Sequence, residues 1–297
     1  MQKTVSVVAI MSFIFAAVFN FYPATYEPIS ENPSLTFSVI SDVHMESNNP
    51  DRLKRFPKIL MDISGAKRKN DALILLGDNT MNGQFIEHCV LTAQLKLFAN
   101  VKNILPVMGN HEIFTPENGY EKGSRKFRMF AGCLAGEKLD KTYYSKEING
   151  CKFIVLGSEA DMGVQAYLSD EQLSWLDSLL AEADKSGKPS FVFCHFPIEG
   201  TVVSFWQEGM IGEQGERLYE ILTSHKNVFY FSGHLHNEVT VSGVTQKDGV
   251  TFVDLPCLLG DGLGYEVEYH DSTVELRVRN HEKGEWLEAL SRSISLN

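Results

Sequence analysis

Residues 228–236 read Val228-Phe229-Tyr230-Phe231-Ser232-Gly233-His234-Leu235-His236, an apolar run that ends abruptly in two histidines. Valine and aromatic residues favour β-strands, and a short continuous apolar run is typical of a strand that is buried on both faces. Strands of this kind belong to parallel sheets that helices cover on either side. The stretch therefore predicts a buried parallel strand whose carboxyl end presents histidine side chains.

Four other apolar runs end in the same way, each followed closely by polar residues. They lie at 37–40, 73–76, 104–108 and 191–194. In open α/β sheets, ligands bind in the crevice at the carboxyl ends of the strands. The polar residues that follow the five runs, and that we expect to share this crevice, are Asp42, His44, Asp78, Asn110, His111, His195, His234 and His236.

Helical patterns alternate with these strands. Helices are expected at 52–67 and 85–100, and a third opens at Ser169, which forms a capping box with Gln172. Strands are expected at 35–40, 72–76, 103–108, 143–148, 152–156, 189–194, 228–231, 250–253 and 265–278. Strands that alternate with helices predict an α/β fold with a mostly parallel sheet and an antiparallel end.

The N-terminal residues differ from the rest of the chain. Lys3 precedes an apolar stretch at 5–19, and no further Lys or Arg appears before Arg52. A basic start, an apolar stretch and an uncharged exit are typical of an export signal. We expect residues 1–30 to be a signal peptide or a signal anchor with a short linker, and residues 31–297 to form one domain. The protein would then be extracellular or anchored on the outer face of the cytoplasmic membrane; a buried core helix is the alternative.

Composition narrows the classes of partner. The chain of 297 residues carries a formal net charge of −11. Proteins that bind polymeric nucleic acid normally present a basic face, so we expect no such partner. The cysteines are scattered without CxxC spacing, which excludes a disulfide framework and a thiolate zinc site on pattern alone. One disulfide, between Cys133 and Cys151, stays open.

The residue types at the strand ends are those of a transition-metal site. Imidazole together with carboxylate suits Mn, Fe, Zn or Co better than Mg or Ca. Residues two apart in an extended chain point the same way, so Asp42 with His44, and His234 with His236, are each expected to act as a pincer. Two such ions about 3.5–4 Å apart bind a phosphoryl group between them and activate a shared water. Asp78 is the natural bridge between the two ions.

Taken in order, these motifs resemble the signature of the calcineurin-like metallophosphoesterase superfamily. The resemblance rests on Asp42-x-His44, Gly77-Asp78, Gly109-Asn110-His111-Glu112, His195 and Gly233-His234-x-His236. Within the superfamily, the chain most resembles the bacterial cyclic-nucleotide-phosphodiesterase-like branch. The resemblance implies an α/β fold built as a four-layer αββα sandwich, in which helices flank two mixed β-sheets, and makes residues 31–297 a metallophosphoesterase domain.

The resemblance also implies a role for each site residue. The first metal ion is expected to bind Asp42, His44, Asp78 and His236. The second is expected to bind Asp78, Asn110, His195 and His234. His111 is expected beside the phosphate as the catalytic proton donor or charge stabiliser, with Glu112 orienting it.

Two positions depart from the family pattern. Purple acid phosphatases place a tyrosine three residues after the bridging aspartate, where this chain has Met81. A tyrosinate-bound iron is therefore not expected. Phe196 replaces a second histidine that many relatives of the cyclic-nucleotide branch carry, which weakens the assignment to that branch without touching the metal site.

The leading hypothesis is a dinuclear-metal phosphoesterase that hydrolyses a small phosphorylated substrate by attack of metal-bound hydroxide. A phosphodiester is favoured over a phosphomonoester, and the two divalent or mixed-valence ions would be Mn, Fe, Zn or Co. The alternative is a binding or scaffold protein that keeps the fold but has lost catalysis. A site that has lost catalysis should lack some of its metal ligands. This sequence has all the ligands of the family pattern, which favours the enzyme. The sequence carries no signal for the oligomeric state.

Signals for substrate recognition are weaker. The basic stretch within 112–141 could meet substrate phosphates or form a solvated helix face, and we favour the second. Phe205 and Trp206 could stack on a substrate or pack over the sheet. The remaining histidines have no partner in a motif and are expected at the surface; they are His88, His225, His270 and His281.

Overall fold

The computed structural model describes residues 25–114, 119–203, 210–238 and 243–296. The strands of a first mixed sheet are β1 (Leu35–Ile40), β2 (Ala72–Leu76), β3 (Ile104–Val107), β10 (Leu263–His270), β11 (Thr273–Asn280), β12 (Glu285–Trp286) and β13 (Arg292–Ser295). Their order is β12-β11-β10-β1-β2-β3, and β13 pairs with β11. Strands β1, β2 and β3 are parallel, whereas β10 lies antiparallel to β1.

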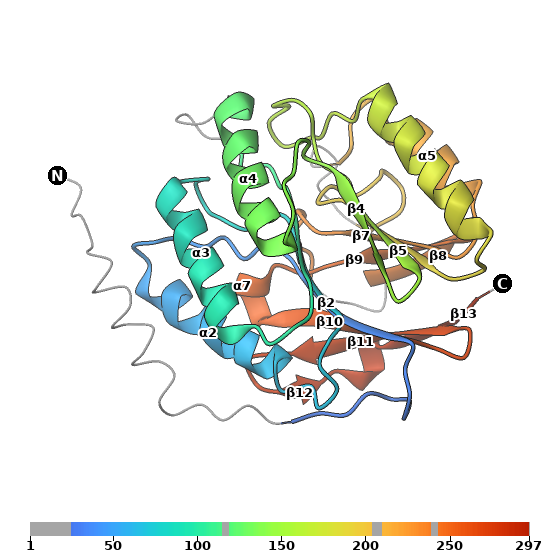
Figure 1. Ribbon diagram of the computed structural model, residues 1–297, viewed down its shortest axis with the longest axis horizontal. Coiled ribbons are helices and arrows are strands. Elements are labelled where there is room, and N and C mark those ends of the chain that lie inside the picture. Colours follow the sequence, from blue (N-terminus) through green and yellow to red (C-terminus); the bar gives the residue numbers. More distant parts are fainter. Residues whose placement is uncertain (1–24, 115–118, 204–209, 239–242, 297) are drawn as a thin grey trace.

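A second mixed sheet packs against the first (Figure 1). Its strands are β4 (Tyr144–Ile148), β5 (Cys151–Val155), β6 (Ser190–Phe193), β7 (Val228–Ser232), β8 (Val244–Lys247) and β9 (Val250–Asp254). Their order is β4-β5-β6-β7-β9-β8, with β5, β6, β7 and β9 parallel. The parallel strands of each sheet thus place their carboxyl ends at one edge, as the apolar runs predict.

Helices cover the outer faces of both sheets. The described helices are α2 (Pro50–Ile63), α3 (Phe85–Phe98), α4 (Gly119–Ala135), α5 (Asp170–Asp184), α6 (Gly215–Thr223) and the short α7 (Leu258–Asp261). Helix α4 differs from the others because it packs Phe127, Ala131 and Ala135 into the core between the sheets, next to β3. Because side chains alternate along a strand, Leu73 and Leu75 of β2 pack under α2 and α3, while Ile74 enters the core between the sheets. On the other side, α5 and α6 pack on Val192 and Tyr230 of the second sheet. The predicted four-layer αββα sandwich is confirmed.

Aromatic side chains fill the core between the two sheets. The ring of Phe37 meets those of Phe153 and Phe191 with centroids 5.0 and 4.8 Å apart. Burying each such side chain contributes about 1.5–3 kcal/mol. This layer holds the two sheets at a fixed distance, so the loops at their shared edge face each other.

Local sequence signals account for several element ends. Asn149 and Gly150 have φ of 52° and 79°, the left-handed pair that a tight hairpin between β4 and β5 needs. The Ser169 hydroxyl accepts from the amide of Gln172 at 3.2 Å, so the predicted helix start is confirmed. Helix α2 begins two residues before the predicted Arg52, because Asn49 caps it.

The predicted signal segment falls mainly on residues 1–24, which lie outside the described residues. From residue 26 the chain already contacts the domain. The Tyr26 ring meets Trp286 edge to face at 5.3 Å, and the amides of Ile29 and Ser30 donate to Glu268 at 2.7 and 2.6 Å. Within the described ranges, no helix is long and apolar enough to cross a membrane.

The structure settles the state of the cysteines and corrects the expected surface position of two histidines. All the cysteines fall in the described part of the chain and all are free, so Cys133 and Cys151 form no disulfide. His88 and His281 are buried and not at the surface. His88 stacks on the ring of Phe130, and His281 contacts the carboxylate of Asp62 at 2.9 Å.

Candidate metal centre

The predicted ligands sit on sharply bent backbone. Five of them have left-handed φ values: Asp42 (57°), His44 (44°), Asp78 (46°), His234 (71°) and His236 (52°). Non-glycine residues adopt this region rarely, and such strain concentrates at functional sites. The pincers predicted from extended chain are therefore wrong in their backbone geometry, because these segments turn at each ligand.

Hydrogen bonds between neighbouring loops hold this bent backbone. The amide of Asp42 donates to the carbonyl of Gly77 at 3.2 Å, and that of His44 donates to the carbonyl of Asp78 at 2.8 Å. A side chain at Gly77 would place its Cβ 2.4 Å from the ring of His195. The loops after β1, β2 and β6 thus meet so closely that only glycine fits between them.

The first group of donors comes from the loops after β1 and β7. The Nε2 atoms of His44 and His236 lie 3.2 Å apart. The Oδ1 atom of Asp42 is 3.0 Å from Nε2 of His236 and 3.6 Å from Nε2 of His44. Nitrogen ligands about 2.0–2.1 Å from one tetrahedral ion would be roughly 3.3 Å apart, so this spacing fits two imidazoles on one ion. His234 and His236 point to different halves of the site and do not form one pincer.

The second group gathers Asp78, His195 and His234, with donor atoms all within 4.8 Å of one another. Nε2 of His195 lies 3.2 Å from Oδ2 of Asp78, while its Nδ1 is 2.7 Å from the carbonyl of Leu76. A carbonyl only accepts, so Nδ1 carries the proton and Nε2 is directed at the site. His234 is oriented in a similar manner by the carbonyl of Val164, 3.0 Å from its Nε2.

Buried polar atoms without a hydrogen bond support a fit to metal ions. Among the described residues, Oδ1 of Asn110 and Nε2 of His195 are buried and have no hydrogen-bond partner. Such atoms are costly unless an ion or water satisfies them. Carboxylate, imidazole and amide donors together suit divalent transition ions.

The charges of the site lead to the same conclusion. Asp42 and Asp78 are 0% and 1% exposed. Burial would raise their pKa values, yet the nearby charge of His195 holds the pKa of both carboxyls below the usual range. Burial also opposes a charge on His195, but the two carboxylates raise its pKa to about 9. A pair of buried carboxylates demands positive charge, which a proton on His195 supplies here and which a bound cation would supply instead.

His44 and His234, which lie beside the carboxylates of Asp42 and Asp78, stay neutral. Burial lowers the pKa of His44 to about 4 and that of His234 to about 4. A neutral imidazole is the form that binds metal. Both rings are therefore ready to act as ligands at neutral pH.

His111 lies between the two groups. Its amide donates to Oδ1 of Asp78 at 2.9 Å, and its ring meets that of His44 edge to face at 4.6 Å. Nδ1 donates to the carbonyl of Met81 at 2.7 Å, so Nε2, 3.8 Å from Oδ2 of Asp78, faces the site. The ring is 32% exposed, which leaves it accessible from solution.

Glu112 does not orient His111, so that sequence prediction is wrong. Its Oε1 accepts from the amide and the hydroxyl of Thr80, and its Oε2 accepts from the amide of Gly109, each at 2.9 Å. Burial and the charge of Asp78 raise its pKa to about 7. Glu112 therefore ties together the loops that carry Asp78 and Asn110.

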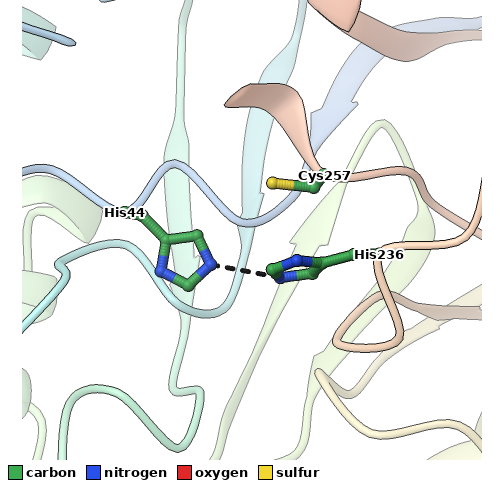
Figure 2. Close-up of side chains that lie close together, drawn as sticks. All are labelled: His44, His236 and Cys257. Carbon is green, nitrogen blue, oxygen red and sulfur yellow. Dashed lines mark hydrogen bonds between the residues drawn. The ribbon is translucent and has the colours of Figure 1, made fainter. Parts of the chain in front are cut away.

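Cys257 is a site residue that the sequence analysis missed. Its thiol, His44 and His236 form a further group of donors within 4.8 Å of one another (Figure 2). It follows the end of β9 by three residues, so the rule that found the other ligands could have found it. Its spacing from the other cysteines gives no signal, because it belongs to no CxxC motif. Phe205 and Trp206, considered as pocket walls, lie outside the described residues.

Known proteins share these features. The sequence pattern of the family described as "Calcineurin-like phosphoesterase" matches residues 35–238. Over 215 residues the chain is 26% identical to the protein named "Probable glycerophosphodiester phosphodiesterase GpdQ" from Arcobacter nitrofigilis, an alignment that covers 68% of this chain and 71% of that protein.

Solved structures of low sequence identity share the fold. A dimetal phosphatase from Danio rerio has a TM-score of 0.62 at 15% identity, over 90% of this chain and 100% of that chain. GAP50, described as the anchor in the inner membrane complex of Plasmodium, has a TM-score of 0.54 at 14% identity, over 89% of this chain and 88% of that chain.

The family pattern spans every predicted ligand from Asp42 to His236, and the fold is that of dimetal phosphatases. The chain belongs to the calcineurin-like phosphoesterase family, as its strand-end motifs predict.

Proposed function

We propose that the protein is a phosphodiesterase that hydrolyses a small phosphorylated substrate with the help of two divalent transition-metal ions. The observation that carries the proposal is the position of His111, an accessible imidazole held between two groups of metal-ligand type. A site that only stored metal would have no use for such a ring. A site that cleaves an ester needs a group that gives a proton to the leaving oxygen.

The assignment of residues to the two ions combines the two groups of donors with the ligand sets that the resemblance to the family implies. Asp42, His44, Asp78 and His236 would hold the first ion. Asp78, Asn110, His195 and His234 would hold the second. When bound, the ions supply positive charge that neutralises the phosphoryl oxygens and acidifies the attacking water.

The chain itself controls the proton at His111. The carbonyl of Met81 accepts the Nδ1 hydrogen, which fixes both the tautomer and the orientation of the ring. Nε2 is then the atom that holds a proton toward the site and releases it to the leaving alcohol. The backbone amide of His111 also donates a hydrogen bond to Asp78, the predicted bridging carboxylate. This bond ties the position of the proton donor to that of the bridge.

One observation favours a diester. The relative from Arcobacter nitrofigilis is named as a phosphodiesterase.

The proposal is tested with bis-p-nitrophenyl phosphate and p-nitrophenyl phosphate, using the full chain stripped of metal and reloaded with Mn, Fe, Zn or Co. We expect metal-dependent hydrolysis with the diester preferred, and a loss of roughly 10²–10⁴-fold in kcat for His111→Ala with both ions retained. Asp78→Ala should lose metal and activity together. His270→Ala, a partly buried histidine outside the site, is the matched control.

Each other outcome has a defined meaning. Preference for the monoester would replace the diester part of the proposal. Absence of turnover with two ions bound per chain would favour the alternative of a binding or scaffold protein that keeps the fold.

We also propose that the enzyme acts outside the cytoplasmic membrane. The support is the sequence of the first residues, in which Lys3 precedes the apolar stretch at 5–19. Extracellular phosphodiesters, including lipid headgroups, would then be within reach. Cell fractionation with protease treatment of intact cells tests this, and protection of the full chain from the protease would contradict it.

A further inference from the structure

Cys257 stands at a strand end of the same kind as the predicted metal ligands. It follows β9, which pairs in parallel with β7. A parallel bridge joins Cys257 to Ser41, and the amide of Leu258 donates to the Ser41 carbonyl at 2.9 Å. These backbone contacts hold Cys257 against the loop that carries Asp42 and His44.

The thiol shares its space with two imidazoles. Figure 2 shows the ring nitrogens of His44 and His236 facing each other, with the sulfur of Cys257 directed toward the space beside both rings. The three donor atoms lie within 4.8 Å of one another. Neighbouring N and S donors on one ion are roughly 3.0–3.6 Å apart, with the shorter values belonging to the five or six ligands that an added sulfur implies here. The thiol donates a weak hydrogen bond to the Asp42 carbonyl at 3.5 Å, and the backbone amides of Leu259 and Gly260 approach the sulfur. The sulfur moves by rotation about a single bond, so a short movement would exchange the weak contact with the carbonyl for a bond to an ion.

The three residues differ in exposure in a way that suits a metal site. His44 is buried, Cys257 is half-buried and the side chain of His236 is 46% exposed. An ion can therefore enter from the side of His236 and meet the sulfur behind it. Sulfur is a softer donor than carboxylate or imidazole, and soft donors select Zn, Co and Cd over Mn and Mg.

We propose that Cys257 is a ligand of the ion held by His44 and His236, and that it gives this half of the site a preference for ions that bind sulfur. The inference rests on the proposed function, because it requires that the site binds metal ions. On binding, the thiol releases its proton to solvent and the sulfur forms the bond to the ion. No such thiol is present in the second group, so the two ion positions differ in chemical character.

The test is the absorption spectrum of the full chain loaded with Co²⁺ alone. A thiolate ligand gives Co²⁺ an intense near-ultraviolet charge-transfer band that imidazole and carboxylate ligands do not give. We expect the band in the unmodified chain and in Cys89→Ser, a half-buried cysteine on α3. We expect Cys257→Ser to lose the band while it keeps two Co²⁺ ions per chain, and its preference for Zn²⁺ over Mn²⁺ should fall by about tenfold or more.

The outcomes separate this inference from the proposed function. Two bound Co²⁺ ions without the band, or a band that persists in Cys257→Ser, would overturn the sulfur ligand and leave the phosphoesterase proposal intact. A chain that binds no Co²⁺ would overturn both.

A second measurement needs no variant and so does not depend on the folding of Cys257→Ser. The unmodified chain is treated with iodoacetamide, with and without Zn²⁺, and labelling at each cysteine is followed by mass spectrometry. A thiolate bound to an ion is shielded from alkylation, so Zn²⁺ should slow labelling at Cys257 by about tenfold or more. Labelling at Cys89 should be unchanged. Equal rates at Cys257 with and without Zn²⁺ would contradict the proposal.

Discussion

Glu112 binds Thr80 through two hydrogen bonds of 2.9 Å, one from the amide and one from the hydroxyl. Its other oxygen accepts from the amide of Gly109. The carboxylate is 0% exposed and acts as a clamp between the loop after β2 and the loop after β3. The distance between Asp78 and Asn110, both predicted ligands of the second ion, depends on this clamp.

Glu112→Gln should weaken the clamp, because an amide nitrogen cannot accept a hydrogen bond from a backbone amide. We expect the free energy of unfolding to fall by about 1–3 kcal/mol. Binding of the second metal ion should weaken more than that of the first. Urea unfolding and metal titration check this, with the exposed Glu121→Gln on α4 as the control. Equal effects of the two substitutions would contradict the assigned role.

Gly77→Ala tests the close approach of the loops. The added Cβ would lie 2.4 Å from the His195 ring, on backbone with φ of 91°. Gly249→Ala is the matched control, since φ is 84° there and nothing lies within 4 Å of the added Cβ. Both variants carry the left-handed strain of about 1 kcal/mol, and Gly77→Ala should lose roughly 1–3 kcal/mol more from overpacking. Thermal unfolding measures the difference, and a difference of zero would mean that His195 has room to move.

The strand-end rule shows why the site was predictable. Parallel neighbours in one sheet bring their carboxyl ends to one edge whatever the loops do, so Asp42 and Asp78 are neighbours once β1 and β2 are recognised as buried strands. The apolar runs reveal those strands because both faces of each are covered. His195 follows β6 of the second sheet and joins them only because the two sheets pack against each other, which the hydrophobic pattern by itself does not predict.

The backbone of the ligand loops was not predictable in the same way. Asp42 adopts φ of 57° because its amide reaches the carbonyl of Gly77, a partner 35 residues away. Short polar strands such as β12 carry no period of their own and exist only by pairing with β11. The role of Met81 also escapes the sequence, because its backbone carbonyl, and not its side chain, positions His111.

Arg279 carries a buried ion pair on the outer face of the first sheet. It binds Asp62 through two hydrogen bonds of 2.7 Å, is 1% exposed, and stacks over Tyr26 and Trp286. Arg279→Met would leave the Asp62 carboxylate with His281 alone, so the free energy of unfolding should fall by about 3–5 kcal/mol.

The control for Arg279→Met lies two residues away on the same strand. Arg277 pairs with Glu288 at 3.4 Å, and the Glu288 side chain is 68% exposed. Solvent screens this pair, but the guanidinium of Arg277 also stacks over Trp286 at 3.6 Å. Arg277→Met should therefore cost about 1–2 kcal/mol, less than Arg279→Met. Urea unfolding of the two variants measures the difference. Equal losses of unfolding free energy in the two variants would show that the burial of the Arg279–Asp62 pair does not increase its contribution to stability.

His225 should make stability depend on pH. Its ring lies 2.8 Å from Asp184 and 2.9 Å from Asp177, and although burial opposes a charge, these carboxylates raise the pKa of His225 above its usual 6.5. When the pKa of a histidine is higher in the folded state than in the unfolded state, its charge stabilises the fold fully at pH values below the unfolded-state pKa. This contribution is lost as the pH rises through the folded-state pKa.

His225→Gln should therefore lower the Tm at pH 5.5, by roughly 2 °C for a loss of about 1 kcal/mol, and have little effect at pH 9. Lys226→Gln, a substitution of the exposed neighbouring residue, is the control and should change the Tm equally at both pH values. A His225→Gln effect that is the same at pH 5.5 and pH 9 would mean that the ring acts through packing, with its charge contributing nothing.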